Sequence, residues 1–361
     1  MRGFGLALAA AAVASAFALP ATSPAGAAVG QATFSNPVGT ANTPDPGVIH
    51  HDGRFLAFTT GGTSEGTFPV HSSKDLVTWK SEGVAFPKGT EPSWAGGGLF
   101  WAPEVHKLHN GSFVMVYCAR AGGAASTQHS IGVATASSPM GPWRHPLDKP
   151  LLSHPDPIGL IDPTLFIEDG HVHLVYKTDA NAVGETTRIL AVELDASATR
   201  VLSPAPWQLL QTSEQWEGPL VEAPWIVRNG GGLYLFYSGN MMDRYAVGVA
   251  RGSSINATDW TKRGPPLLSA DNATGWDLVG PGHCSVLQLP AGGQAGEEGA
   301  WMMWFHTWMG HQQSYNFGEP RRLTQAVLTW DKSTGWPSLA VGGIRPPVGP
   351  RPVPPFQHRD P

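Results

Sequence analysis

Three acidic residues each open a short apolar segment of the chain. They are Asp45 in TPDPGVI, Asp162 in IDPTLF and Glu222 in VEAPWI. Two carboxyl groups can cleave a glycosidic bond when one activates water and the other donates a proton to the leaving oxygen. A third carboxyl held close by raises the pKa of a neighbour, which favours a protonated donor. The three acids are therefore candidates for acid–base catalysis.

These acids belong to a repeat that runs through the whole chain. Five similar segments start at Asp45, Ala102, Asp162, Glu222 and Gly282, which are 57, 60, 60 and 60 residues apart. A turn containing glycine and a second apolar stretch, such as GRFLAFTT or GAWMMWFHT, follow each segment. A third strand and, in most units, a short outer strand come next. Each unit is predicted to hold about four strands, and this self-similarity indicates a repeat fold.

Five such units predict an all-β fold, a five-bladed β-propeller over residues 29–344. Radial packing of the blades buries both faces of each sheet. Two β-sandwiches are the alternative, but they would not require five evenly spaced copies of one segment. Asp-Pro is also a common start of a turn, which would explain any single acid. In a propeller, however, the first strand of each blade lines the axis, so Asp45, Asp162 and Glu222 are expected to share one pocket.

The two ends of the chain differ from the repeats. Residues 1–28 carry Arg2, an apolar run and small residues up to Ala28, which is typical of a secretory signal peptide. The apolar run is shorter than a bilayer span requires. We therefore expect a secreted, extracellular protein whose mature form has no membrane attachment. Residues 345–361 are Pro-rich and are predicted to form an extended tail.

Composition narrows the possible partners and cofactors. Only 14% of residues are charged and the net charge is -5, so no basic surface for nucleic acid is expected. Cys118 and Cys284 could pair or remain buried thiols, and the residues leave this open. The chain has no CxxC or HExxH motif. No organic cofactor is expected, because two carboxyls and a water complete a glycoside hydrolysis.

Between Asn36 and Gly343 the chain resembles glycoside hydrolase family 43. The resemblance is carried, in this order, by TPDPGVI, WAPEV, IDPTLF, VEAPWI, GPGHCSV and RRLTQAVLTWD. Such a series is far more specific than any one of its parts. It implies a five-bladed propeller that acts on arabinose- or xylose-containing polysaccharides or oligosaccharides of the plant cell wall.

The resemblance also implies roles for the three acids. Asp45 would be the general base that deprotonates water, and Glu222 the general acid. Asp162 would keep Glu222 protonated and orient it. Members of the family invert the anomeric centre, which implies that the carboxyls of Asp45 and Glu222 lie about 6.5–9.5 Å apart.

The resemblance assigns two further basic residues. His283 would reach a central water or calcium site, with any calcium contact running through water, since calcium prefers oxygen ligands. A hydrogen-bonded buried histidine is the alternative. Arg322 stands eight residues before Trp330 and would hold the sugar and the acid, whereas the adjacent Arg321 is not assigned this role.

Apolar and polar neighbours complete the expected pocket. Trp101 and Ile161 are expected to form walls on either side of the sugar, whereas core packing explains most tryptophans. Lys177 and Asp179, in the sequence YKTDAN, are interpreted as a solvated turn without a role. Glu104 and Glu217 lie near the motifs and are not assigned to catalysis.

These expectations lead to one preferred function and several alternatives. The preferred function is a secreted inverting glycosidase that cleaves α-L-arabinofuranosyl linkages of arabinan or arabinoxylan. A β-xylosidase of the same family and a non-catalytic carbohydrate-binding propeller are the main alternatives. Retaining fructan-cleaving enzymes share the blade count, but their Asn-Asp-Pro-Asn, Arg-Asp-Pro and Glu-Cys motifs are replaced here by Thr-Pro-Asp-Pro, Ile-Asp-Pro and Glu-Ala.

Overall fold

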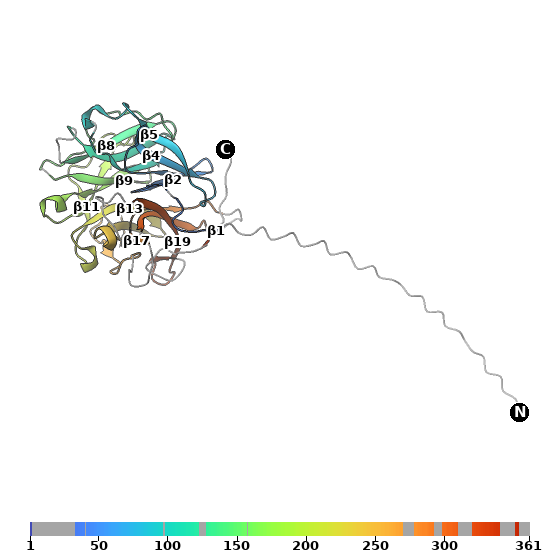
Figure 1. Cartoon of the computed structure of the whole chain (residues 1–361). Helices are drawn as coiled ribbons and strands as arrows, with labels where there is room; N and C mark the ends of the chain where they lie inside the picture. The colour runs from blue at the N-terminus through green and yellow to red at the C-terminus, as the bar shows by residue number, and fades with distance from the viewer. Residues whose placement is uncertain are drawn as a thin grey trace. The chain divides into compact units, whose positions relative to one another are not determined.

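The fold consists almost entirely of antiparallel strands (Figure 1). The structure, a computed structural model, describes Met1 and residues 33–39, 41–96, 98–122, 128–156, 158–269, 278–291, 298–309, 320–339 and 351–353. The predicted signal peptide, apart from Met1, lies outside the described residues. The all-β prediction is confirmed: the described residues contain no α-helix, and their helical turns are the short 3₁₀ turns η1 (Ser93–Ala95), η3 (Ala180–Val183), η4 (Gln215–Glu217) and η5 (Met242–Arg244).

Five sheets follow one another along the chain, each built from consecutive antiparallel strands. The first contains β2 (Gly47–His51), β3 (Arg54–Phe58), β4 (Gly66–Ser73) and β5 (Lys80–Pro87). The second contains β6 (Trp101–Lys107), β7 (Phe113–Arg120) and β8 (His129–Ala136). The third contains β9 (Leu160–Glu168), β10 (His171–Thr178), β11 (Arg188–Leu194) and β12 (Trp207–Gln211).

The last two sheets repeat the same order. The fourth contains β13 (Val221–Asn229), β14 (Gly232–Gly239), β15 (Ala246–Gly252) and β16 (Thr261–Lys262). The fifth contains β17 (Leu278–Gln288), β18 (Trp301–Met309), β19 (Arg321–Trp330) and β20 (Pro337–Leu339). The expected four strands are thus present in four sheets. In the second sheet, isolated bridges to Leu152 and Arg144 stand in place of a fourth strand.

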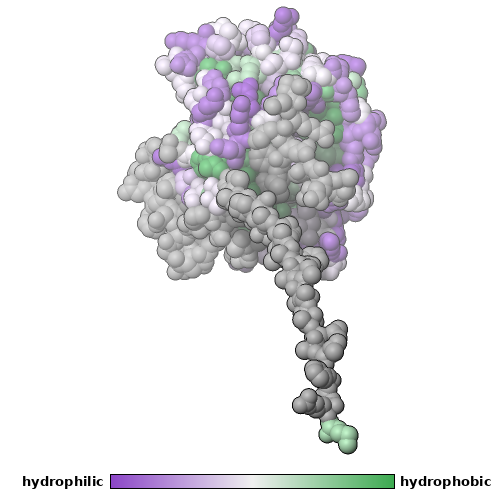
Figure 2. All heavy atoms as spheres, turned by 90° about the vertical axis from the view of Figure 1, so that its right-hand side faces the viewer, coloured by the Kyte–Doolittle hydropathy of each residue, from purple (hydrophilic) through white to green (hydrophobic). Residues whose placement is uncertain are grey.

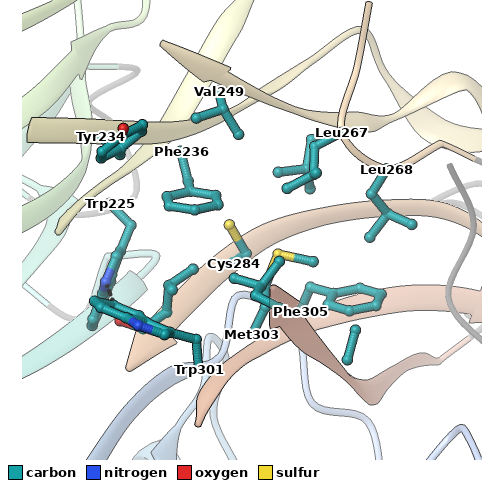
Figure 3. Close-up of a cluster of buried hydrophobic side chains, with 14 of the residues drawn as sticks. Trp225, Tyr234, Phe236, Val249, Leu267, Leu268, Cys284, Trp301, Met303 and Phe305 are labelled. Carbon is teal, nitrogen blue, oxygen red and sulfur yellow. Dashed lines mark hydrogen bonds between the residues drawn. The ribbon is translucent and has the colours of Figure 1, made fainter. Parts of the chain in front are cut away.

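Five apolar clusters show how the sheets are arranged, because each cluster combines residues of two neighbouring sheets. Figure 3 shows the one between the fourth and fifth sheets, where Phe236 and Val249 face Met303 and Phe305. Another cluster joins the fifth sheet back to the first through Trp304 and its neighbours. Five interfaces between five sheets close a ring, which confirms the five-bladed propeller.

Closure of the ring depends on Trp304 of β18. Its side chain is fully buried, its ring centroid lies 5.6 Å from that of Phe55 in β3, and its Nε1 donates to Gln325 Oε1 at 3.0 Å. We expect Trp304→Ala to lower the free energy of unfolding by about 3–5 kcal/mol, measured by urea denaturation, because it opens a cavity where first and last blades meet. Trp330→Ala, at a partly buried ring in another blade interface, should cost less. Equal decreases in the free energy of unfolding for the two variants would contradict a special role of the interface between the first and last blades.

Residues at the C-terminus take part in the fold. Strand β1 (Thr33–Phe34) pairs with β21 (Arg351–Pro352), and the buried Val353 packs with Phe34 in the closure cluster. Residues 351–353 of the predicted Pro-rich tail therefore belong to the folded part of the protein. Arg351 and Pro352 form a two-stranded sheet with Thr33 and Phe34, and Val353 packs in the closure cluster. The other residues of that tail, and the boundary predicted at 344, lie outside the described residues.

Both cysteines are buried and unpaired. Figure 3 shows Cys284 pointing into the cluster between the fourth and fifth sheets. Within the described ranges, no helix has the length and apolar character needed to cross a membrane. On the face drawn in Figure 2, hydrophilic side chains predominate at the described surface, with apolar residues scattered between them. Most buried apolar side chains of the described residues lie in the clusters between the blades.

Candidate active site

In every blade, one non-glycine residue in or just before the first strand has left-handed backbone. These residues are Asp45 (φ 51°), Ala102 (46°), Asp162 (52°), Ala223 (52°) and His283 (51°). In four of the blades the strand pairing shifts register around this residue, as at a β-bulge. A non-glycine residue rarely adopts positive φ, so its recurrence in all five blades marks a shared structural position.

This shared position corrects one part of the predicted repeat. Asp45 and Asp162 occupy it, but the corresponding residue of the fourth blade is Ala223 rather than Glu222. Glu222 stands one residue earlier, next to the bulge where the pairing shifts between Glu222 and Trp225. The acids are therefore not equivalent by position, although they enter the same space.

A cavity of about 460 Å³ opens where the five inner strands begin. It contains Asp45, Asp162 and Glu222 together, and the predicted Trp101, Ile161 and His283 also line it. Residues to which the sequence analysis gave no place in the site line it as well. They are Thr60, Lys177, Asp179, Asn181, Ala182, Leu220, Met241, Tyr245, His306 and Arg321. Trp308, which with Trp225 was a candidate for the rim of the pocket, lines it too.

Asp45 is held as an anion by the groups around it. Burial by itself raises the pKa of Asp45, but the charge of Arg321, with a smaller contribution from His283, outweighs this and holds the pKa below its usual value. Arg321 Nη1 donates to Asp45 Oδ1 at 2.7 Å. The His283 Nδ1 atom lies 3.4 Å from the same oxygen. An ionised carboxylate at this place can accept a proton from water.

His306 contributes from the second strand of the last blade. Its Nδ1 accepts the backbone N–H of Asp45 at 3.2 Å, so this nitrogen carries no proton and the ring is neutral. Burial lowers the pKa of His306 well below its usual value, in agreement with a neutral ring. The imidazole stacks on Tyr245, with ring centroids 5.6 Å apart. His306 therefore orients the backbone of Asp45 and does not neutralise its carboxylate.

Asp162 and Glu222 form a second, contrasting pair. Burial, followed by the charge of Glu222, raises the pKa of Asp162 well above its usual value. Asp162 Oδ2 accepts the backbone N–H of Ala223 at 3.0 Å, which ties the third blade to the residue after Glu222. Two carboxyls that repel each other titrate as a pair. This pair can therefore hold one proton in a pocket where Asp45 holds none.

The prediction for Arg322 is wrong in position. The guanidinium that contacts Asp45 belongs to Arg321, which also lies over the Trp308 ring at 5.7 Å and lines the cavity. Arg322 is not among the residues that line it. Adjacent residues of a strand point to opposite faces, and pairing of Trp308 with Arg321 across β18 and β19 puts Arg321 on the cavity side.

The interpretation of Lys177 as part of a solvated turn is also wrong. Lys177 belongs to β10, and its side chain is only 1% exposed. Its ammonium donates to Glu222 Oε2 at 2.9 Å and to Asp179 Oδ1 at 3.0 Å. A buried charge requires such partners. Lys177 and Asp179 are therefore part of the site.

His283 sits at the shared left-handed position of the fifth blade, and its backbone N–H donates to Ser238 Oγ at 2.8 Å. Gly282 before it is required by packing, because a Cβ there would lie 1.8 Å from the Tyr245 ring. A calcium ion does not fit the described side chains well. No group of three or more Asp, Glu, His or Cys among them could hold a metal ion, so the calcium implied by resemblance stays a prediction.

Aromatic side chains give the cavity its apolar walls. Trp101 stacks on His129 with ring centroids 3.9 Å apart, which fixes its indole beside the cavity. Trp308 is a second indole in the lining. Trp225, in contrast, donates from Nε1 to Val286 O inside a blade interface. The sequence alone could not separate the wall tryptophans from those of the core.

Glu104 and Glu217 are buried but do not line the cavity. Glu217 pairs with Lys262, 2.6 Å away, and accepts the Tyr237 hydroxyl at 2.7 Å. Burial raises the pKa of Glu104 well above its usual value, and the charges of Asp162 and Asp45 add to this. Neither glutamate lines the cavity, although Glu104 lies close enough to Asp162 and Asp45 to be affected by their charges.

Comparison with known proteins supports this geometry. The family model described as "Glycosyl hydrolases family 43" matches residues 34–337. The extracellular exo-alpha-(1->5)-L-arabinofuranosidase of Streptomyces avermitilis is 26% identical over 279 residues, and the match covers 73% of this chain and 55% of the relative. The chain thus spans about half the length of that relative.

Two further matches cover more of the related protein. The extracellular exo-alpha-(1->5)-L-arabinofuranosidase ArbA of Cellvibrio japonicus is 27% identical over 273 residues, covering 67% of this chain and 74% of the relative. The crystal structure of a thermostable family-43 glycoside hydrolase matches with a TM-score of 0.72 at 27% identity, covering 88% of this chain and 99% of that one. The fold is therefore shared over nearly the whole propeller.

Proposed function

Because the chain belongs to glycosyl hydrolases family 43, we propose that it hydrolyses α-L-arabinofuranosyl linkages of arabinan or arabinoxylan with inversion of the anomeric centre. The names of the two arabinofuranosidase relatives support arabinose as the sugar. The observation that carries the proposal is the convergence of Asp45, Asp162 and Glu222 in one cavity, in two electrostatically different settings.

The proposed reaction uses the difference between Asp45, which is ionised, and the Asp162–Glu222 pair, which can hold a proton. Asp45 takes a proton from a water molecule as the water oxygen bonds to the anomeric carbon. The glycosidic bond breaks on the opposite side, and its oxygen takes the proton of Glu222. Asp45 ends protonated and Glu222 ionised, and exchange with solvent restores both. Asp162 supports the donor, because its nearby carboxyl disfavours a second negative charge on Glu222.

The walls and the arginine position the sugar for this step. Trp101 and Trp308 offer apolar faces, Ile161 adds a further contact, and Arg321 presents a fixed cation beside Asp45. Holding the sugar between the base and the acid removes much of the entropic barrier of a reaction with water. No step of this reaction is routed through a metal ion.

The two neighbouring arginines give a matched test of the site. We expect Arg321→Ala to lower kcat/KM for arabinose release by about 10²-fold or more, because Asp45 loses its charge partner and the sugar loses a contact. Arg322→Ala should change kcat/KM by less than about threefold. Initial rates on an arabino-oligosaccharide measure both. A larger loss in Arg322→Ala would restore the assignment made from the sequence.

The product profile on arabinan, arabinoxylan and xylo-oligosaccharides tests the proposed function. We expect arabinose as the released sugar, and proton NMR during the first minutes should show the β-anomer from α-linked substrate. Release of xylose alone would favour a β-xylosidase. Binding without any product would favour a carbohydrate-binding propeller, and the α-anomer as first product would contradict Asp45 as a water-activating base.

The proposal places this activity outside the cell. The signal-peptide pattern of residues 1–28 supports it, and both arabinofuranosidase relatives are named extracellular. Large plant polysaccharides can reach an enzyme only there. Amino-terminal sequencing of protein recovered from culture medium should find a start near Ala28.

A further inference from the structure

Lys177 is the buried cation that touches the proposed acid. Its side chain is 1% exposed, and its ammonium donates to Glu222 Oε2 at 2.9 Å and to Asp179 Oδ1 at 3.0 Å. Burial by itself lowers the pKa of Lys177, but Glu222, Asp179 and Asp162 outweigh this and raise the pKa above its usual value. The neighbouring carboxyl groups therefore favour the charged ammonium.

The blade geometry puts this charge where it acts on Glu222. Lys177 pairs with Ile161 across β9 and β10, and the bulge at Asp162 lies directly beside this pair. Four titratable groups act on Glu222 directly: Asp162 of β9, Lys177 of β10, Tyr245 before β15 and His283 of β17. Asp179, in the turn after β10, acts through Lys177.

This arrangement contains a conflict of charges. A cation at hydrogen-bond distance favours the ionised form of a carboxyl, whereas a general acid must carry a proton. Two carboxyl groups oppose the cation: Asp179 shares the same ammonium, and Asp162 lies close enough to Glu222 that the pair disfavours two negative charges. The carboxylate of Asp179 forms an ion pair with Lys177 at 3.0 Å, on the same ammonium that contacts Glu222.

We propose that Lys177 and Asp179 form a positioning pair for the general acid, in which Lys177 fixes the orientation of Glu222 and Asp179 offsets its charge so that Glu222 keeps its proton. This inference rests on the proposed function. Lys177 holds Oε2 as an acceptor in both protonation states, so the transferable proton is placed on Oε1, the oxygen left for the substrate. The pair thereby sets the pH above which the acid fails.

This balance of charges predicts the direction in which each substitution shifts the pH at which Glu222 loses its proton. Lys177→Met removes the cation at similar side-chain length, so Glu222 should hold its proton to higher pH, by about one pH unit or more. Asp179→Asn removes the offset and leaves the cation, so Glu222 should lose its proton at lower pH, by up to about one unit. A merely structural role would not move the two variants in opposite directions.

Carbon-13 NMR of protein labelled at the glutamate δ-carboxyls measures this directly and does not depend on turnover. Glu222→Gln identifies the resonance by its disappearance, and titrations of the wild type, Lys177→Met and Asp179→Asn give three midpoints. We expect the order Asp179→Asn, wild type, Lys177→Met from low to high pH. The alkaline limb of kcat/KM for arabinose release should follow the same order.

Lys262→Met is the matched control, because Lys262 also pairs with a buried glutamate, Glu217, that does not line the cavity. It should lower stability and leave the Glu222 midpoint in place. Unchanged midpoints in both test variants, or shifts in the same direction, would overturn the inference. A wild type that releases no arabinose would contradict the proposed function and not this inference. The two outcomes can be told apart, because the Glu222 midpoints are measured by NMR without any turnover.

Discussion

Glu222→Gln is expected to lower kcat/KM for arabinose release from an arabino-oligosaccharide by about 10²–10⁴-fold, the usual contribution of a positioned general acid. A glutamine keeps the acceptor for Lys177 and nearly the same shape, but it has no acidic proton to give to the glycosidic oxygen. The sugar should still bind, since the walls of the cavity are unchanged. The loss should therefore appear in kcat more than in KM.

A change of leaving group makes this prediction specific. Nitrophenolate departs without protonation, so the same variant should lose far less activity on a nitrophenyl arabinofuranoside than on an oligosaccharide. Glu217→Gln is the control, because Glu217 is buried against Lys262 outside the cavity. It should reduce stability and affect both substrates alike. An equal loss on both substrates in Glu222→Gln would argue against proton donation by this residue.

The repeat in the sequence was sufficient to predict the ring and the end of the channel where the acids meet. The spacing of the segments at Asp45, Ala102 and Asp162 follows the shared left-handed positions closely. The spacing is off by one residue in the fourth and fifth blades, where Ala223 and His283 hold this position rather than Glu222 and Gly282, because spacing in sequence does not show which residue of a bulge is left-handed. The motif still led to the cavity, since both residues beside the bulge approach the axis.

The residues that the sequence analysis missed depend on contacts between distant strands. The choice between Arg321 and Arg322 requires the register of β18 against β19, which neither residue type reveals. Lys177 follows an apolar run and resembles the polar end of a strand, yet seven of the eight residues of β10 are buried. A lysine inside a blade covered on both faces must be paired, and that rule was the available signal.

The metal site shows a different limit. His283 was placed correctly in the cavity, but its environment depends on Asp45, Tyr245 and Ser238 from other blades. A histidine motif indicates a ligand only where other donors converge, and the described side chains supply no such cluster. The cavity position of His283 agrees with the structure, and its contact with a central water or calcium ion stays a prediction.

Asp45→Ala is expected to lower arabinose release by about 10²–10⁴-fold, because it removes the carboxylate that we propose takes the proton from water. The substitution suits the backbone, since Ala102 and Ala223 already occupy the same left-handed position in other blades. Folding should therefore survive, and the lost activity can be ascribed to the carboxylate. Circular dichroism and a urea titration check that the variant is folded.

Azide distinguishes the base from the other acids of the cavity. In Asp45→Ala the space beside Arg321 can admit this small anion, which needs no deprotonation to attack. A bond then forms between azide nitrogen and the anomeric carbon as the glycosidic bond breaks, and the leaving oxygen takes the proton of Glu222. The product should be the β-arabinofuranosyl azide, identified by NMR.

Asp162→Ala, changed at the same backbone position of another blade, is the control. It should lose activity without rescue by azide, because the carboxyl of Asp162 faces Glu222 and not the water. Rescue in Asp162→Ala, or an azide of retained configuration, would assign the roles of these two aspartates differently.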